Sequence, residues 1–138
     1  MSANGHGDRD QWMWLRADVW SAASARDAVR EAVAEWGLPV EVGARAAQVA
    51  VGLVLYAVQH SHSRLSFRVA VENGAVVLEV QTDSAMPDFG AKGWERSPHL
   101  AEMRALADGH GITRRKSHRR LWASIPSTQE AGLSYSVG

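Results

Sequence analysis

The sequence predicts an α+β fold: a two-layer sandwich with a mixed, mostly antiparallel sheet and helices on one face of that sheet. Two long segments carry apolar residues at helical spacing, and alternating segments typical of strands stand before and after them. The dipeptide Asn73-Gly74 separates two of the alternating segments, which is a strong signal for a β-hairpin. Helices and antiparallel strands in this order indicate one sheet covered by helices.

Length and composition indicate a single soluble domain. A chain of 138 residues can bury one core, and its 15 basic residues are balanced by 15 acidic ones. This zero balance provides no long-range attraction to nucleic acid or to an anionic membrane. Cysteine is absent, which excludes disulfides and thiolate chemistry. We expect a disordered N-terminus at 1–10, one domain at 11–126 and a flexible tail at 127–138.

The sequence predicts no targeting or membrane segment. Its polar, partly acidic start differs from a signal peptide. The longest apolar run, residues 46–58, contains Gln48 and is shorter than the about 20 residues that cross a bilayer. We therefore expect a cytoplasmic protein.

The first half of the chain predicts a strand and two helices. Residues 11–20 alternate between two partly covered faces, which is typical of a strand. A helix is predicted from a cap at Ser21 or Ser24 as far as Trp36. A second helix, at 41–60, is apolar over most of its circumference and should be buried.

The second half predicts four strands, a loop and a helix. Strands at 63–72 and 75–81 flank the hairpin dipeptide. Residues 82–97 lack periodicity and predict a long loop, which in a compact domain is typical of a lid. A helix is predicted at 98–109, and Gly111 is taken as a boundary. The chain then predicts a final hairpin formed by residues 112–115 and 119–125.

The buried helix also carries a resemblance to a known family. Its segment AAQVAVGLVLYAVQH, residues 46–60, resembles the nucleotide-binding helix of GHKL ATPase domains, in particular the anti-sigma regulatory factor and serine-kinase branch, which reads roughly E-L-V-T-N-A-V-R-H. The resemblance implies that Gly52 stands where the family has its catalytic carboxylate. It implies that Tyr56 stands where an asparagine holds the magnesium ion. Neither residue can do that chemistry, and the phenol of Tyr56 would fill much of the cavity.

A second segment, LEVQTDSAMP at residues 78–87, is similar to the family strand that ends near an adenine-binding aspartate. The resemblance places that position at Thr82, with Asp83 one residue later. Adjacent residues at a strand end point to opposite faces, so a one-residue bulge would be needed to bring Asp83 into place. Thr82 and Asp83 are the expected contacts if a nucleotide binds.

A third segment, residues 104–111, resembles the family's helix "ALADRWG". Just before that helix the family has a glycine turn whose backbone amides wrap the phosphates. This chain has Ser97-Pro98-His99-Leu100 there, and Pro98 lacks an N–H donor. The carboxylate, the metal-holding amide and the glycine turn are thus all missing or displaced.

These losses lead to the expectation of a non-catalytic, nucleotide-binding-deficient regulator, a pseudokinase with no catalytic residue, metal or cofactor. The resemblance implies a regulatory partner such as a sigma factor or an anti-anti-sigma factor, and a homodimer is a further option. One alternative stays open: an anti-sigma serine kinase that binds Mg-ATP through Asp83, with Glu79 or Glu95 holding the metal.

A second alternative is nucleic-acid binding through the basic hairpin at 114–120, with Trp122 nearby to stack on a base. Strand alternation would split its arginines between two faces, which favours a solvated hairpin or an acidic protein partner. His60 and His62 form an H-x-H pair without a third metal ligand at a known spacing. The chain has six tryptophans, and any exposed near the N-terminal strand would anchor a partner.

Overall fold

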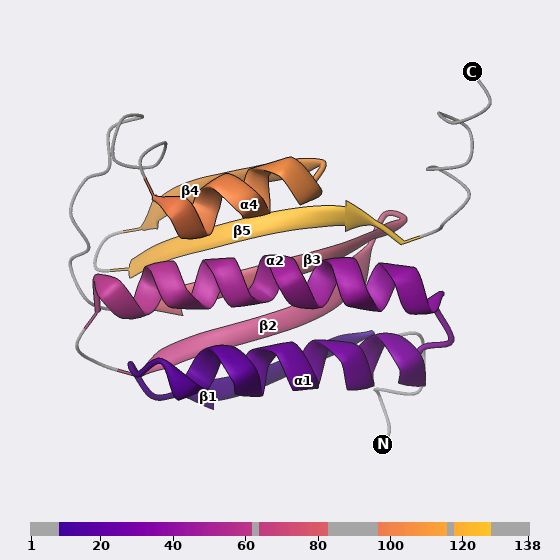
Figure 1. Cartoon of the computed structure of the whole chain (residues 1–138), viewed down its shortest axis with the longest axis horizontal. Helices are drawn as coiled ribbons and strands as arrows, with labels where there is room; N and C mark the ends of the chain where they lie inside the picture. Colours follow the sequence, from indigo (N-terminus) through magenta and orange to yellow (C-terminus); the bar gives the residue numbers. More distant parts are fainter. Residues whose placement is uncertain (1–8, 62–63, 83–96, 116–117, 128–138) are drawn as a thin grey trace.

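The computed structural model describes residues 9–61, 64–82, 97–115 and 118–127, which form five strands and three helices over one sheet face (Figure 1). In chain order the elements are β1 (Asp10–Leu15), α1 (Trp20–Glu35), α2 (Val40–Gln59), β2 (Leu65–Glu72), β3 (Ala75–Thr82), α4 (Pro98–Leu106), β4 (Gly109–Arg115) and β5 (His118–Pro126). The ends expected to be disordered or flexible lie outside the described residues, apart from Arg9, Asp10 and Ser127.

The sheet confirms the predicted α+β class. Its strand order is β1-β2-β3-β5-β4, so β1 and β4 are the edges. We predicted a mixed, mostly antiparallel sheet, and all four pairings between the described strands are antiparallel. The hairpin between β2 and β3 is also confirmed: Asn73 and Gly74 both have positive φ, 50° and 77°, as a tight two-residue turn requires.

The start of α1 corrects the predicted cap. The helix begins at Trp20, so Ser21 lies in its first turn and Ser24 lies further inside it. The Asp18 carboxylate accepts the Ser21 backbone N–H at 3.2 Å, and the Ser21 hydroxyl donates to the Arg16 carbonyl at 2.6 Å. Aspartate before the helix therefore does what a capping serine was expected to do.

Gly111 is also not a boundary, because it lies within β4 opposite Trp122 of β5. A Cβ atom on Gly111 would lie 2.8 Å from Nε1 of Trp122, so the missing side chain makes room for the indole. The preceding helix ends at Leu106, earlier than predicted.

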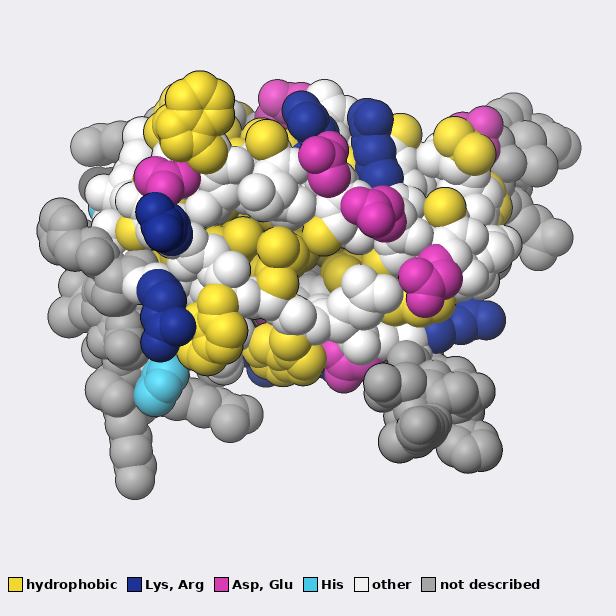
Figure 2. Space-filling view, turned by 90° about the horizontal axis from the view of Figure 1, so that it is seen from below, with side chains coloured by type: hydrophobic (Ala, Val, Ile, Leu, Met, Phe, Trp, Pro, Cys, Tyr) yellow, Lys and Arg dark blue, Asp and Glu magenta, His cyan; other side chains and the backbone are white. Residues whose placement is uncertain are grey.

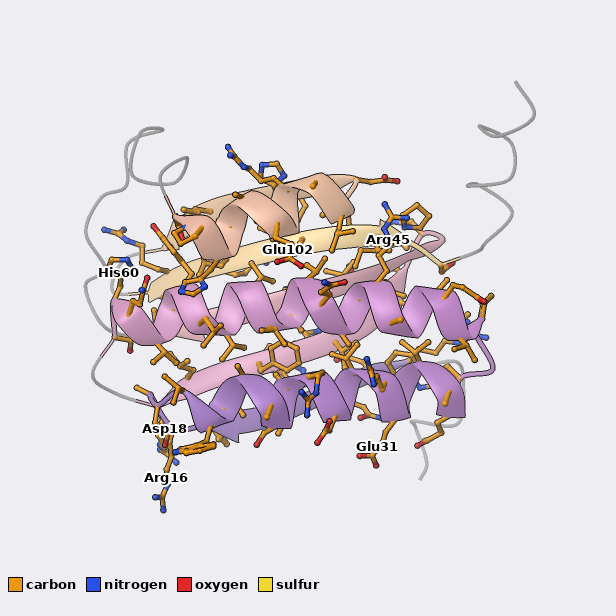
Figure 3. The ribbon with its side chains drawn as sticks, in the orientation of Figure 1. Arg16, Asp18, Glu31, Arg45, His60 and Glu102 are labelled. Atoms are coloured by element: carbon orange, nitrogen blue, oxygen red, sulfur yellow. The ribbon has the colours of Figure 1, made fainter. Side chains whose placement is uncertain are left out.

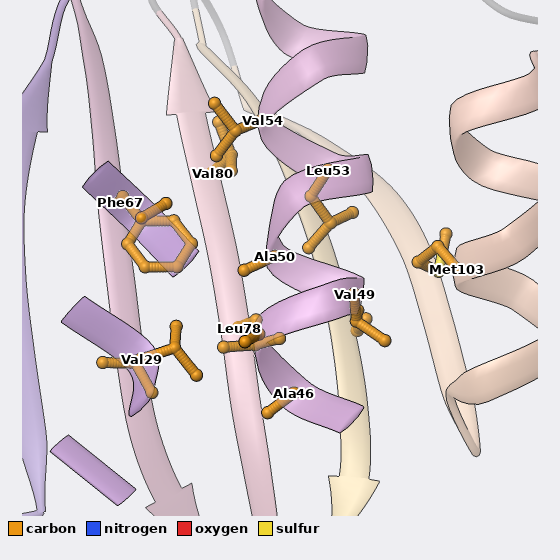
Figure 4. Close-up of a cluster of buried hydrophobic side chains, with 14 of the residues drawn as sticks. Val29, Ala46, Val49, Ala50, Leu53, Val54, Phe67, Leu78, Val80 and Met103 are labelled. Atoms are coloured by element: carbon orange, nitrogen blue, oxygen red, sulfur yellow. The ribbon is translucent and has the colours of Figure 1, made fainter. Parts of the chain in front are cut away.

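The core lies between the sheet and α2, which contacts α1, α4, β3 and β5. Leu53 of α2 belongs to a buried cluster that also includes Phe67 of β2, Leu78 of β3 and Met103 of α4 (Figure 4). By length and composition alone α2 could cross a membrane, but 56% of its most apolar window is buried inside the fold. Burial of this kind is what the core helix of a soluble protein also shows.

Candidate functional site

The position that the resemblance assigns to the catalytic carboxylate lies at a close contact between α2 and α4. Gly52 is buried there, and a Cβ atom on it would lie 2.6 Å from the backbone oxygen of His99 and 3.5 Å from Cβ of Met103. Real Cβ atoms essentially never approach an oxygen so closely, and this oxygen belongs to the backbone of the first turn of α4. A side chain at residue 52 therefore requires α4 to move.

Two polar contacts hold α4 against the same side of α2. Nε of Arg45 donates to the Leu106 carbonyl at 2.6 Å, and Nε2 of Gln48 donates to Oε1 of Glu102 at 2.5 Å. Arg45 and Glu102 are both visible between the two helices in Figure 3. Residues 45, 48 and 52 follow one another at helical spacing, so α4 is held along successive turns of α2.

A pocket of about 520 Å³ lies beside this contact, between α1, α2 and α4. Arg26 and Arg30 of α1 line it together with Gln48, His99 and Glu102. The Glu102 carboxylate already accepts the Gln48 amide. No group of three or more His, Cys, Asp or Glu side chains among the described residues is arranged to hold a metal ion.

Tyr56, which the resemblance places at the position of the magnesium-holding amide, is buried inside the fold. Its side chain is 1% exposed, and its ring lies 4.8 Å from that of His60, centroid to centroid. Burial raises the pKa of the Tyr56 phenol and lowers the pKa of His60. At neutral pH the pair is therefore an uncharged phenol beside an imidazole that resists protonation.

Thr82 ends β3 on the side that faces the helices. It is buried, and its hydroxyl lies 3.0 Å from that of Ser61, just after α2. This contact ties the end of β3 to the end of α2. Asp83 and Glu95 lie outside the described residues, as does His62, so their predicted roles stay predictions.

Glu79 lies on the other face of the sheet, which corrects the metal role considered for it. Its carboxylate accepts hydrogen bonds from Arg68 at 3.2 and 3.3 Å and lies 3.6 Å from Nη1 of Arg120. Its neighbours Leu78 and Val80 point toward α2 instead (Figure 4). Because strand residues alternate, Glu79 cannot reach a cleft on the helical face.

This charged cluster was not predicted, although the sequence contains a signal for it. Arg68 also pairs with Asp10 at 3.0 Å and with Glu72 at 2.6 Å, and its side chain is only 14% exposed. The hairpin register puts Arg68 directly opposite Glu79. Counting outward from Asn73-Gly74 would have paired the two charges.

The basic hairpin divides its charges as predicted from strand alternation. Arg120 lies on the helix-free face beside Glu79, and Arg119, its neighbour in β5, has the opposite parity. The side chains of residues 114–117 lie outside the described residues.

Comparison with known proteins identifies the fold. No known protein-family model and no curated protein matches the sequence. The crystal structure of the RsbU and RsbW domains of Rv1364c from Mycobacterium tuberculosis is similar, with a TM-score of 0.66 and 19% identity over 85% of this chain and 32% of that chain. The Acinetobacter baumannii histidine kinase AdeS matches with a TM-score of 0.53 and 13% identity, covering 85% of this chain and 68% of that one.

The chain has the GHKL-like ATPase fold. The likeness predicted from the three sequence segments is thus confirmed for the fold. At these identities it extends no further, and the chain spans about a third of the Mycobacterium tuberculosis structure. Within the GHKL-like fold, the assignments of Gly52, Tyr56 and Thr82 still rest on the sequence resemblance.

Proposed function

We propose that this GHKL-like chain is a non-catalytic cytoplasmic regulator that acts by binding another protein and does not bind Mg-ATP. The observation that carries the proposal is the contact of Gly52 with the His99 carbonyl. Phosphoryl transfer depends on positioned groups and on neutralised phosphate charge. At residue 52 there is no side chain, and the space in which one would begin is taken by the backbone of α4.

Tyr56 supports the same conclusion. Magnesium prefers small, hard oxygen ligands, and an asparagine amide supplies one where a buried phenol does not. The raised pKa of Tyr56 keeps its oxygen protonated, so the residue offers no anionic ligand. The first turn of α4 begins with Pro98, which has no N–H to offer a phosphate.

The fold and the exposed surface support the partner class that we propose. One similar structure contains an RsbW domain, and the resemblance to anti-sigma factors implies a sigma factor or an anti-anti-sigma factor as partner. Trp12, Trp14 and Trp20 are 56%, 66% and 78% exposed. Exposed tryptophans are common anchors of protein interfaces. These side chains could therefore bind a partner protein without any catalytic step.

A thermal-shift titration with Mg-ATP and Mg-ADP tests the proposal, with Mg²⁺ alone as the control for ion effects. We expect no saturable shift. A nucleotide at a hundred times its dissociation constant would add about 2.7 kcal/mol to the free energy of unfolding, which such a titration detects readily. A saturable shift that Asp83→Ala abolishes would establish a divergent nucleotide site and overturn the proposal.

A further inference from the structure

The helix-free face of the sheet carries a pocket of about 660 Å³. The side chains that line it include Trp12, Trp14, Arg64, Ser66, Gln81 and His118. Pockets that bind small molecules usually have volumes of about 300–1000 Å³. Figure 2 views the molecule over α1 and β1 and shows hydrophobic side chains protruding beside basic ones. The pocket therefore has the size and the mixed apolar and polar lining of a small-molecule site.

The sheet register explains why this face is hollow. Trp14 of β1, Ser66 of β2 and Gln81 of β3 lie opposite one another in one row across three strands. Opposite side chains in a row stand about 4.5–5.5 Å apart at Cβ. Serine is the shortest of the three, so a space remains between the indole and the amide. Trp12, two residues before Trp14, points to the same face and extends the apolar wall.

Arg64 gives this space a positive charge. Its guanidinium lies 4.8 Å from the ring centroid of Trp14, a contact that orients the group without neutralising its charge. Within the described parts of the chain, no carboxylate pairs with Arg64 and no acidic side chain lines the pocket. Arg68, in the next row, differs because three carboxylates pair with it. The pocket therefore favours an anion.

Two polar side chains that line the pocket can donate hydrogen bonds to such an anion. They are the hydroxyl of Ser66 and the amide of Gln81, which are adjacent in the row. Neither side chain is hydrogen-bonded to another residue that the structure describes. A few polar groups in a largely apolar pocket are what fixes the orientation of a small ligand.

We propose that this pocket binds a small aromatic carboxylate. The flat rings of the ligand lie against the indoles of Trp12 and Trp14, since aromatic rings associate favourably. The carboxylate accepts hydrogen bonds from the guanidinium of Arg64, which is a strong, charge-assisted contact. A cationic ligand is disfavoured, because a guanidinium already lies against the indole of Trp14. The site is on the other side of the sheet from α2 and α4.

A strand of nucleic acid fits this face less well. Such strands are held by several cations that follow the phosphates, together with aromatic side chains that stack on the bases. Arg68 and Arg120 lie on the same face, but both pair with Glu79. One unpaired guanidinium suits a ligand with a single negative charge.

The test is a titration of the full chain with 2-naphthoate, followed by NMR of the indole N–H signals of its six tryptophans. Trp12→Phe and Trp14→Phe identify the two signals of interest. We expect both to shift saturably. 2-Naphthylmethanol has the same rings without the charge, and cyclohexanecarboxylate has the charge without aromatic rings. Each should bind about tenfold or more weakly than 2-naphthoate.

Variants of the pocket test its geometry. Arg64→Gln should raise the dissociation constant about tenfold or more, because hydrogen bonds to a charged group are stronger than neutral ones. Ser66→Ile should abolish binding by filling the space, and isoleucine suits a strand. Arg26→Gln is the matched control, because it removes an exposed arginine from the pocket between the helices. It should leave the dissociation constant unchanged. Circular dichroism checks that each variant folds.

Several results would overturn the inference. One is the absence of a saturable shift of the two indole signals. Another is binding that survives both Arg64→Gln and Ser66→Ile, or that Arg26→Gln weakens as much as Arg64→Gln does. A single-stranded oligonucleotide that shifts the two signals where 2-naphthoate does not would make this face a nucleic-acid surface instead. None of these results bears on the nucleotide titration, which reports on α2 and α4.

Discussion

Gly52 sets the distance between two helices by having no side chain. Inside a helix, glycine costs about 1 kcal/mol relative to alanine, so sequence alone marks the residue as a local weakness. In the fold its Cα faces the backbone of α4, and that close approach is available to glycine alone. The residue that the resemblance places at the family's catalytic position is therefore also the one that lets α4 pack closely against α2.

Gly52→Ala should lower the free energy of unfolding despite the better helix propensity of alanine. Overpacking costs about 1–3 kcal/mol, and the contacted atom here is backbone, which cannot turn aside. Alanine gains about 1 kcal/mol in an open helix. With an overpacking cost in the upper part of its range, the expected net loss is about 1–2 kcal/mol. Urea denaturation measures it.

Gly43→Ala in the same helix is the matched control, since its Cβ would lie 3.2 Å from a methyl carbon of Val33, which can shift. It should cost less than Gly52→Ala. Equal or higher stability of Gly52→Ala relative to the wild type would show that α4 is not held at this contact.

At the scale of elements, the β2–β3 hairpin decides where the charges of the sheet lie. Asn73 and Gly74 set the register, and the register puts Arg68 opposite Glu79 on the helix-free face. The Glu79 side chain is only 7% exposed, so its charge depends on these partners. The two-residue turn thereby determines that Arg68 and Glu79, which lie several residues from it, form an ion pair.

Arg68→Ala should destabilise the sheet by about 3 kcal/mol, the low end of the range for a broken buried pair. Arg120 remains near Glu79 and limits the loss. Replacing both Arg68 and Glu79 by methionine should recover much of the stability, because no buried charge is then left alone.

Chemical denaturation of these variants is compared with Arg26→Ala, which breaks an exposed pair with Asp27. That control should cost under about 1 kcal/mol. If Arg68→Ala costs no more than the control, the cluster contributes little to the sheet.

At the scale of the whole molecule, α2 is the helix that packs against the most other elements. It contacts both neighbouring helices and the central strands, whereas the main packing partner of α4 is α2. An element with one main neighbour opens more easily than one packed on several sides.

Hydrogen exchange followed by mass spectrometry should therefore show α4 exchanging before the centre of α2. In Gly52→Ala the exchange of α4 should rise further, while that of β2 and β3 should change little, because the contact at residue 52 joins α4 to α2 alone. Uniform exchange of α2 and α4 in the wild type would contradict this order of stability.

Predictions from the sequence held where a short segment carries its own signal. The all-round apolar character of α2 predicted its burial, and Asn73-Gly74 predicted the hairpin. They were wrong where one residue type suits two structural roles. Gly111 resembled a boundary because glycine suits both turns and close approaches, and only Trp122, eleven residues later, decides between them. Ser21 was predicted to cap the helix because the sequence does not show that the Asp18 carboxylate accepts the Ser21 backbone N–H.

For the candidate site, the resemblance predicts which residues stand at the family's positions, but the sequence does not show what surrounds them. The resemblance alone predicts the loss of a carboxylate at Gly52. It does not predict the contact with His99, since that contact depends on how a helix 46 residues later returns across the sheet.

The sequence by itself determined the α+β class, the hairpin register and the likeness to GHKL ATPase domains. These follow from periodicity, turn chemistry and side-chain identity within a few residues. Only the tertiary structure decided that α4 rests on Gly52, that Glu79 faces away from the helices and that the tryptophans of β1 stand exposed at an edge. The physical reason is that packing distances and sheet edges arise between distant segments, where no local pattern specifies which atoms meet.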